Sequence, residues 1–270
     1  MEIKPIIYQW HIDLSVLMLT VAIFYFYFLV SRFKPHRRDW CFWVTVALFL
    51  LVECSPLQYL GMHAYFSAHM VNHVILLLLC GPLLVLSIPS KPTFRMLNPI
   101  LILSAFFARH SWVSWLTGVG IMWLWHIPAI FSSSHEHNML LHSGSLLLAG
   151  MVFSWPLFGP IKSDHIHALS GIIYLFTACI SCSLLGLLIT FAPVGTFHHD
   201  TTMAGMGINP LNITPRTDQQ AAGLIMWVPC CLVYLSGCLY LLMRWFAEKA
   251  GNLVDEFSNL NHSLKEHDRK

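Results

Sequence analysis

Charged residues are scarce in this sequence. Its 15 Lys and Arg and 13 Asp and Glu residues make up 10% of the 270 residues, whereas about 25% of the residues of a soluble domain are charged. Hydrophobic residues make up 56%. This composition excludes an ordinary soluble domain and predicts an integral membrane protein in contact with the lipid bilayer. No segment suggests binding to nucleic acid.

The sequence also has no recognisable signal peptide and no disulfide framework. The first apolar run has no basic segment before it and no small-residue cleavage site, so we expect it to be retained as a membrane span. The cysteines lie in or beside apolar runs and do not form the spacing pattern of a disulfide scaffold. They are Cys41, Cys54, Cys80, Cys179, Cys182, Cys230, Cys231 and Cys238.

Long apolar segments are abundant. A transmembrane helix needs about 20 mostly apolar residues, and seven segments meet that requirement. They are 12–31, 41–60, 67–87, 112–131, 138–158, 168–191 and 220–245. The run NPILILSAFF (98–107) is too short to cross, so we expect it to lie at the membrane interface or dip into it. The pattern predicts an all-α fold, a bundle of seven transmembrane helices.

Lys and Arg predict the orientation of this bundle, because cytoplasmic loops of membrane proteins are enriched in them. Thirteen of the fifteen fall on one side of the predicted spans, and Lys4 and Arg216 fall on the other. We therefore expect the N-terminus outside and the C-terminus in the cytoplasm. The thirteen are Arg32, Lys34, Arg37, Arg38, Lys91, Arg95, Arg109, Lys162, Arg244, Lys249, Lys265, Arg269 and Lys270.

We treat residues 1–246 as a single membrane domain without an internal repeat. Residues 247–270 form a polar tail of mixed charge, for which we expect a short helical pattern at best. The longest outer loop, 192–218, contains His198 and His199 and has no clear periodicity. A loop of that length is either disordered or functional.

His69 and His73 stand one helical turn apart in FSAHMVNHVILLLLCGPLLVL (66–86), which is otherwise apolar. Their i, i+4 spacing places both rings on one helix face, about 6 Å apart along the axis. Ionisable residues inside membrane spans are candidate functional sites, because they lose water and need a partner, a cavity or a metal. The pair therefore has the spacing of a metal chelate.

Two further histidines, His126 and His142, are expected at nearly the same outer depth on other spans. Imidazole suits copper, zinc, iron and nickel, and copper(II) binds most tightly in the divalent series. Met70 and Met122 lie near enough in depth to offer thioether sulfur, which selects copper(I), although core packing is the simpler reading for them. Further candidate ligands, or partners for the ring N–H groups, are Asp13, Glu53, Asp218 and His63.

Other residues have plainer interpretations. Cys179 and Cys182 form a CxxC spacing, and Cys230 and Cys231 follow Pro229. Cysteines in the middle of a span usually act as small apolar residues, and redox or metal chemistry is the alternative for both pairs. Trp123, Trp125 and Trp227 are expected to be aromatic anchors at the membrane interface. His63 and the other loop histidines also fit ordinary residues at headgroup level.

Several blocks resemble one known family. They are WHID (10–13), SPL (55–57), FSAHMVNHVILLLLCGPLLVL (66–86), MWLWHIPAIF (122–131), HSGSLLLAGMVFSWPLFGP (142–160) and DQQAAGLIMWVPCCLVYL (218–235). In this order they resemble the CtaG family of caa3-type cytochrome c oxidase assembly factors, from about residue 8 to 245.

The resemblance implies a seven-span protein needed to mature a haem–copper oxidase. Carried over by motif, it implies a site at His69, His73, His126 and His142, with Asp218 and Gln219 at the head of the last span. The chain departs from the family pattern at Cys230 and Cys231, where we expect small glycines, and in the length of the loop 192–218.

The resulting functional hypothesis is a copper-binding assembly chaperone in a bacterial plasma (inner) membrane, with several membrane spans. It would pass copper to an apo-subunit of the oxidase, and a copper-donating protein is a further candidate partner. No nucleophile–base arrangement is visible, so we do not expect an enzyme.

Two alternatives remain at this stage. One is a haem-bearing electron-transfer protein, with His73 and either His126 or His142 as axial ligands; an i, i+4 pair cannot supply both ligands to one haem. The other is a di-metal membrane oxidoreductase built from the histidine boxes HMVNH, HEH and HH. We expect copper as the cofactor rather than haem.

Overall fold

The structure is a computed structural model that describes residues 10, 13–31, 37–89, 98–127, 139–161, 165–194, 196–197 and 211–267. Within these residues the secondary structure is helical, and no strand occurs. The helices, in chain order, are α1 (Leu14–Ser31), α2 (Asp39–Cys54), α3 (Pro56–His63), α4 (Phe66–Ile75), η2 (Leu76–Cys80), α5 (Gly81–Ser87), α6 (Asn98–Arg109), α7 (Ser111–Trp125), α9 (Met139–Phe158), α10 (Ala168–Phe191) and α12 (Pro215–His267). This confirms the all-α prediction.

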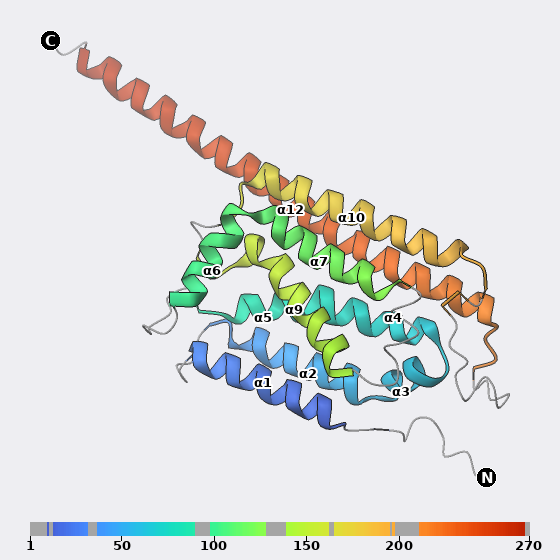
Figure 1. Cartoon of the computed structure of the whole chain (residues 1–270). Coiled ribbons are helices and arrows are strands. Elements are labelled where there is room, and N and C mark those ends of the chain that lie inside the picture. Colours follow the sequence, from blue (N-terminus) through green and yellow to red (C-terminus); the bar gives the residue numbers. More distant parts are fainter. Residues whose placement is uncertain are drawn as a thin grey trace, which may run out of the picture.

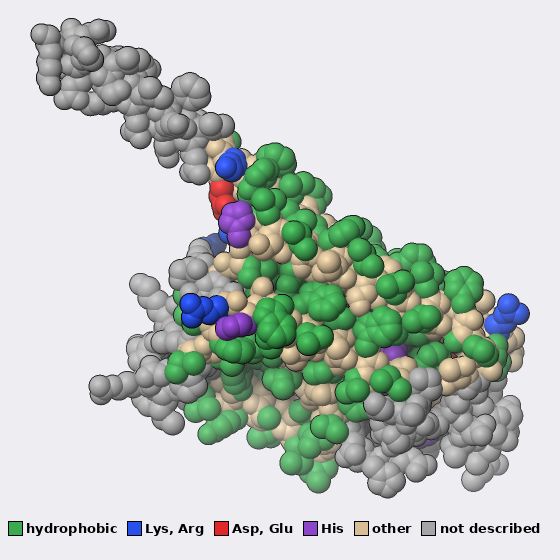
Figure 2. All heavy atoms as spheres, turned by 45° about the horizontal axis from the view of Figure 1, so that its top comes forward, with side chains coloured by type: hydrophobic (Ala, Val, Ile, Leu, Met, Phe, Trp, Pro, Cys, Tyr) green, Lys and Arg blue, Asp and Glu red, His purple; other side chains and the backbone are tan. Residues whose placement is uncertain are grey.

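Many of these helices present apolar side chains to the outside. Phe176 and Leu232 are 50% and 64% exposed, and many other large hydrophobic residues are similarly exposed. Figure 2 shows them spread over the face that carries α10 and α12, with Lys and Arg near its ends. An apolar surface of this extent needs lipid around it, so the protein is a membrane protein.

The lengths of the helices test the predicted spans. Four stretches are long and apolar enough to cross a membrane, namely Phe66–Ser87, Leu140–Phe158, Ala168–Phe191 and Pro215–Gly251. The pair α2 and α3, bent by 46°, is a fifth if it counts as one span. The predicted segments 12–31 and 112–131 coincide with α1 and α7, which have 18 and 15 residues. Seven crossings therefore stay a prediction.

Prolines account for two irregularities in these spans. Pro56 begins α3 directly after the bend from α2. In the span 66–87, η2 is a π-helical turn, and the Gly81 amide donates to the Leu76 carbonyl five residues before it. Pro82 has no amide hydrogen for the regular ladder. π-turns of this kind occur often at functional sites, and this one follows His73 by one turn.

The last helix differs from the prediction for the tail. We expected a short helical pattern at best in 247–270, but α12 runs without a break for 53 residues, to His267. Figure 1 shows its C-terminal part projecting away from the bundle. The prediction failed because adding a residue to an existing helix costs little once the costly first turn has formed, and residues 247–267 contain no proline.

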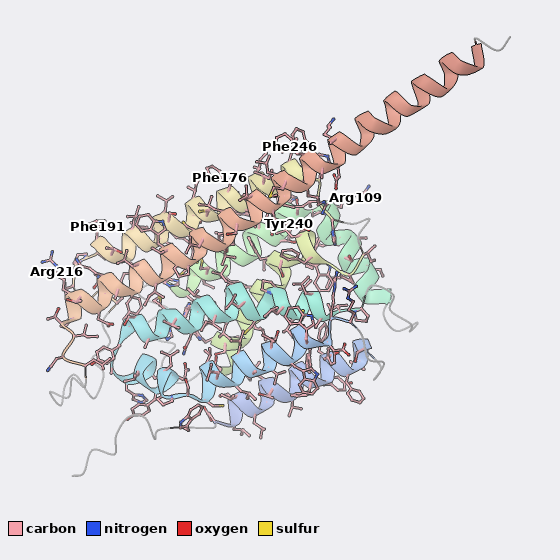
Figure 3. All side chains as sticks on the ribbon, turned by 180° about the vertical axis from the view of Figure 1, so that it is seen from behind. Arg109, Phe176, Phe191, Arg216, Tyr240 and Phe246 are labelled. Carbon is pink, nitrogen blue, oxygen red and sulfur yellow. The ribbon has the colours of Figure 1, made fainter. Side chains whose placement is uncertain are left out.

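Charged residues mark the two ends of the bundle. Figure 3 shows Arg216 at one end and Arg109 at the other, which agrees with their assignment to opposite sides. The orientation of the bundle in a membrane, with the N-terminus outside, stays a prediction. The helix α6, with 12 residues, has the short length expected of the run 98–107, and its placement at the interface is likewise a prediction.

Two hydrophobic clusters form most of the described core. One joins α4, α7, α9, α10 and α12 around residues such as Met70, Met122 and Cys182. The other joins α1, α2, α5 and α9 around residues such as Phe49 and Leu146. Helix α7 contributes to both clusters, and the candidate site lies along α4, α7 and α9.

Candidate metal centre

The helix α4 places His69 and His73 in the interior. Both side chains are buried, at 4% and 2% exposed. Their Nε2 atoms lie 2.9 Å apart, and their ring centroids are 4.5 Å apart. The i, i+4 spacing predicted from the sequence therefore brings the two rings into direct contact, inside an apolar span.

The third ring comes from α9. The Nε2 atom of His142 lies 2.8 Å from that of His73, and the ring centroids of His69 and His142 are 5.1 Å apart. One ligand atom from each of the three side chains lies within 4.8 Å of the others. Among the described residues, these three histidines form the group of His, Cys, Asp and Glu side chains whose ligand atoms converge in this way.

A close contact between two glycines explains why α4 and α9 deliver their histidines to the same place. A Cβ atom on Gly81, at the start of α5, would lie 2.5 Å from the carbonyl carbon of Gly150. The span that continues from α4 through η2 into α5 therefore touches α9 there through its backbone. Each histidine precedes its glycine by eight residues, 73 to 81 and 142 to 150. The His73–His142 contact and the Gly81–Gly150 contact are thus separated by eight residues in the same direction on each helix, so the two helices run parallel. The rings of His73 and His142 lie about 12 Å along the axis from the glycine crossing.

Trp125 packs against the His142 ring. It is 7% exposed, its ring packs edge-on against His142 at 4.9 Å, and its Nε1 donates to Ser145 Oγ at 2.9 Å. Ser145 Oγ in turn donates to the His142 carbonyl. The prediction of an interfacial anchor was therefore wrong for Trp125, because its indole N–H finds a partner inside the protein.

His126 lies beside the three histidines but makes its own contacts. Its ring centroid is 5.1 Å from that of His73. Nδ1 lies 2.6 Å from the Met122 carbonyl oxygen, to which it donates, and Nε2 lies 3.2 Å from the Met70 sulfur. The predicted set of four histidines is thus three converging rings and one neighbour, and Met70 is the side chain that faces this neighbour.

Asp218 and Gln219 act at helix ends. The carboxylate of Asp218 accepts hydrogen bonds from the amides of Phe66 and Ser67, at 2.7 and 3.1 Å, and from the Ser67 hydroxyl. It therefore caps α4, the helix of His69 and His73, and its charge suits the positive end of the helix dipole. Gln219 Nε2 donates to the carbonyls of Ile189 and Ala192 at the end of α10.

The remaining predicted residues lie outside the three-histidine group. Asp13 is exposed and accepts hydrogen bonds from the Leu14 amide and the Ser15 hydroxyl at the start of α1. The Nδ1 atom of His63 lies 3.0 Å from the Tyr59 carbonyl oxygen, and its ring stacks on Tyr59. These contacts are those of a helix cap and of a satisfied half-buried histidine.

Glu53 lies in surroundings that are unusual for an acidic side chain. It is 3% exposed, and no described group lies within 3.5 Å of its carboxylate oxygens in hydrogen-bonding geometry. The side chain of Ser143, the residue after His142, lies close to this carboxyl group. A buried carboxyl group beside the histidine-bearing helix fits a partner for a ring N–H group.

Several histidines of the sequence analysis lie outside the described residues. They are His11, His135, His137, His198 and His199. Parts of the loop 192–218 are described, and two of its residues, Phe197 and Leu211, contact the start of α4. Phe197 stacks on Phe66 with ring centroids 5.5 Å apart, and the Leu211 amide donates to the Tyr65 hydroxyl.

Sequence reasoning missed two features of the site, the Gly81–Gly150 crossing and the pair Trp125 and Ser145. Small residues in spans favour close helix contacts, so the two glycines were a usable signal. The pairing of Gly81 with Gly150 left no signal, since nothing in the sequence says which glycine of one span faces which glycine of another.

Comparisons with known proteins give one family. No curated protein and no solved structure shows a significant match to the chain. The family model of the cytochrome c oxidase caa3 assembly factor (Caa3_CtaG) matches residues 13–248, which include every histidine of the site. The chain therefore belongs to the cytochrome c oxidase caa3 assembly factor family, whose role is to assemble an oxidase and not to catalyse a reaction of its own.

Proposed function

We propose that this protein binds copper through His69, His73 and His142 and passes it to the apo-subunit of a haem–copper oxidase. In this proposal the site faces the outer side of a bacterial plasma membrane, and copper is cargo. The observation that carries it is the convergence of three Nε2 atoms, with separations of 2.9 and 2.8 Å around His73.

Hydrogen bonding alone does not account well for this arrangement. An imidazole nitrogen carries either one hydrogen or one lone pair, so Nε2 of His73 can make one well-aligned hydrogen bond but not two. A cation between the rings would accept a lone pair from each of them. The convergence therefore favours a metal ion over a chain of three hydrogen-bonded rings.

The three nitrogens also fit a metal ion in size. With metal–nitrogen bonds of about 2.0 Å, tetrahedral ligand atoms lie about 3.3 Å apart. The observed separations of 2.8 and 2.9 Å are within about 0.5 Å of that value. Three protein ligands leave one position open. An incoming ligand from the client subunit can occupy it, and this allows transfer by ligand exchange.

The surroundings of the site favour copper among the metals that imidazole binds. Copper(II) is the strongest binder in the divalent series, and thioether sulfur selects copper(I). The bond from His126 Nδ1 to the Met122 carbonyl leaves the lone pair on Nε2, 3.2 Å from the Met70 sulfur. Both atoms are acceptors, so a soft cation would relieve this contact too.

The geometry counts against the haem alternative in which His73 and His142 are the axial ligands. Two axial histidines bind from opposite faces of the haem, so their nitrogens are separated by two metal–nitrogen bonds, about 4 Å. The Nε2 atoms of His73 and His142 are 2.8 Å apart, which leaves no space for the ring. Of the boxes in the di-metal alternative, HEH and HH lie outside the described residues.

Metal analysis of the purified protein tests the proposal. Protein from copper-replete cells should contain near-stoichiometric copper, and the double variant His69→Ala and His73→Ala should lose it. His63→Ala is the matched control, because His63 bonds to the Tyr59 carbonyl. Copper-free wild-type protein, together with normal oxidase maturation in cells that carry the double variant, would contradict the proposal. A Soret band in the wild type would favour haem instead.

A further inference from the structure

A second group of candidate ligands lies in the core, away from the three histidines. Cys179 and Cys182 on α10 face Cys230 and Cys231 on α12, and these two helices pack along their length (Figure 1). The sequence suggested small apolar residues at all four positions. The structure brings their sulfur atoms together with Met122 of α7.

Three of these sulfurs form a contiguous group, which we name the sulfur cluster: Met122, Cys182 and Cys230. The Cys182 thiol lies 3.5 Å from the Met122 sulfur, and the Cys230 thiol and the Tyr234 hydroxyl lie beside it in the same buried part of the core. All three sulfur residues are 1% exposed. A thioether and two thiols therefore meet in a space closed to water.

The other two cysteines form a separate pair. The Sγ atoms of Cys179 and Cys231 lie 3.1 Å apart, and Ser183 Oγ lies 3.2 Å from that of Cys231. Cys231 is half-buried, and no thioether contact to this pair is among the described interactions. The pair is the more natural place for a disulfide, while the sulfur cluster has the donors of a metal site.

We propose that the sulfur cluster is a second metal site, which binds a soft monovalent ion with Cu(I) as the natural probe. Cysteine and methionine sulfur are the ligands that select Cu(I). With metal–sulfur bonds of about 2.3 Å, three sulfurs around one ion lie about 4 Å apart, close to the 3.5 Å between Met122 and Cys182. The site goes beyond the proposed function because it uses none of the three converging histidines.

The charge that Cu(I) binding leaves at this site can be stabilised by a neighbouring hydroxyl group. Cu(I) binding to both thiolates releases two protons and leaves a net charge of −1, which is costly in an apolar core. The Tyr234 hydroxyl lies close to Cys182 and can donate a hydrogen bond to the thiolate, which lowers that cost. No electron is transferred, so the step needs neither an oxidant nor a reductant beyond the conditions that keep copper monovalent.

The sulfur cluster touches the histidine site through α7. Met122 carries the cluster's thioether, and its carbonyl accepts the hydrogen bond from His126. His126 in turn contacts Met70, and its ring lies 5.1 Å from that of His73. Nitrogen and sulfur ligands thus form a continuous series of contacts from α4 to α12.

Titration of the reduced protein with Cu(I) against a chromogenic Cu(I) chelator tests the inference. Protein with His69→Ala and His73→Ala should still bind one Cu(I), and Cys182→Ala with Cys230→Ala added should abolish that binding. Cys54→Ala with Cys80→Ala is the matched control, since both are buried cysteines of the other core cluster. X-ray absorption should show sulfur neighbours at about 2.3 Å.

Met122→Leu keeps the core volume and removes one donor, so it serves where the cysteine variants fold poorly. It should weaken Cu(I) binding at least tenfold, about the loss seen when even an outer partner of a metal ligand is removed. Met226 is equally buried in the same hydrophobic core cluster but is not part of the sulfur cluster, so Met226→Leu should leave Cu(I) binding unchanged. Unchanged Cu(I) binding in the cysteine and Met122 variants, or a Cys182–Cys230 disulfide with no Cu(I) bound after reduction, would overturn the inference. If the three histidines bound no copper but the sulfur cluster still bound Cu(I), the proposed function would fail and this inference would hold.

Discussion

The histidine site and the sulfur cluster are built in different ways, although α7 touches both. The three histidines depend on a helix crossing at Gly81 and Gly150 and on a cap that Asp218 supplies from the other end of the chain. The sulfur cluster lies along α10 and α12, which pack side by side. The first site should therefore respond to distant changes in helix position, and the second mainly to loss of its own donors.

The largest effect is expected from removing the central ring of the histidine site. His73→Ala deletes the nitrogen that contacts both His69 and His142. Copper affinity at this site should fall by more than about 100-fold, or about 3 kcal/mol, because losing a ligand exceeds the cost of losing an outer partner. Equilibrium dialysis checks this. An equal loss in His63→Ala would show that the effect is not specific to the three rings.

A change at the helix crossing should separate the two sites. In Gly150→Ala the new Cβ would lie 2.4 Å from the carbonyl oxygen of Leu77 in η2, so α9 must move away from η2. We expect a loss of about 1–3 kcal/mol in stability and weaker copper binding at the histidines, with Cu(I) binding at the sulfur cluster unchanged. Thermal unfolding in detergent measures the first effect.

Gly120→Ala is the control for the crossing, since nothing lies within 4 Å of a Cβ atom there. It should leave both stability and metal binding near the wild-type values. A similar loss of stability and copper binding in both glycine variants would indicate a general effect of alanine in these helices. It would contradict a specific role for the Gly81–Gly150 crossing.

Loss of the distant cap tests whether α4 needs it. Asp218→Asn keeps the shape but removes the charge that accepts the Phe66 and Ser67 amides. A hydrogen bond to a buried charged group contributes about 1.5–3 kcal/mol, so stability should fall by about that amount and copper binding should weaken. Asp13→Asn removes the charge at the exposed start of α1 and should cost about 0.5 kcal/mol or less. Equal losses in the two variants would contradict the special role of Asp218.

The smallest effect is expected at Ser145. Ser145→Ala leaves the buried Trp125 N–H without its acceptor, which costs about 1 kcal/mol. The His142 ring should become less well fixed, and copper affinity should fall a few-fold. Ser154→Ala provides the comparison, because Ser154 makes the same type of bond to a carbonyl three residues before it. Dialysis of both variants decides whether Trp125 positions the ring.

Much of the fold was readable from local patterns. Apolar runs of sufficient length predicted the helices, and the i, i+4 spacing predicted that His69 and His73 share a face, because both depend on residues near one another in sequence. The helical tail was missed because a polar segment without proline gives only a weak indication for or against a helix. Depth alone placed His126 with the other three histidines, but depth does not give the angle of a side chain around its helix.

The sequence by itself determined that this is a helical membrane protein with a candidate chelate in an apolar span, since composition and period are local properties. The tertiary structure decided which residues complete that chelate. The Gly81–Gly150 contact selects His142, Asp218 becomes a helix cap, and Cys182 of α10 meets Met122 of α7. Such pairings depend on the rotation and crossing of helices far apart in the chain, which are set by packing between them.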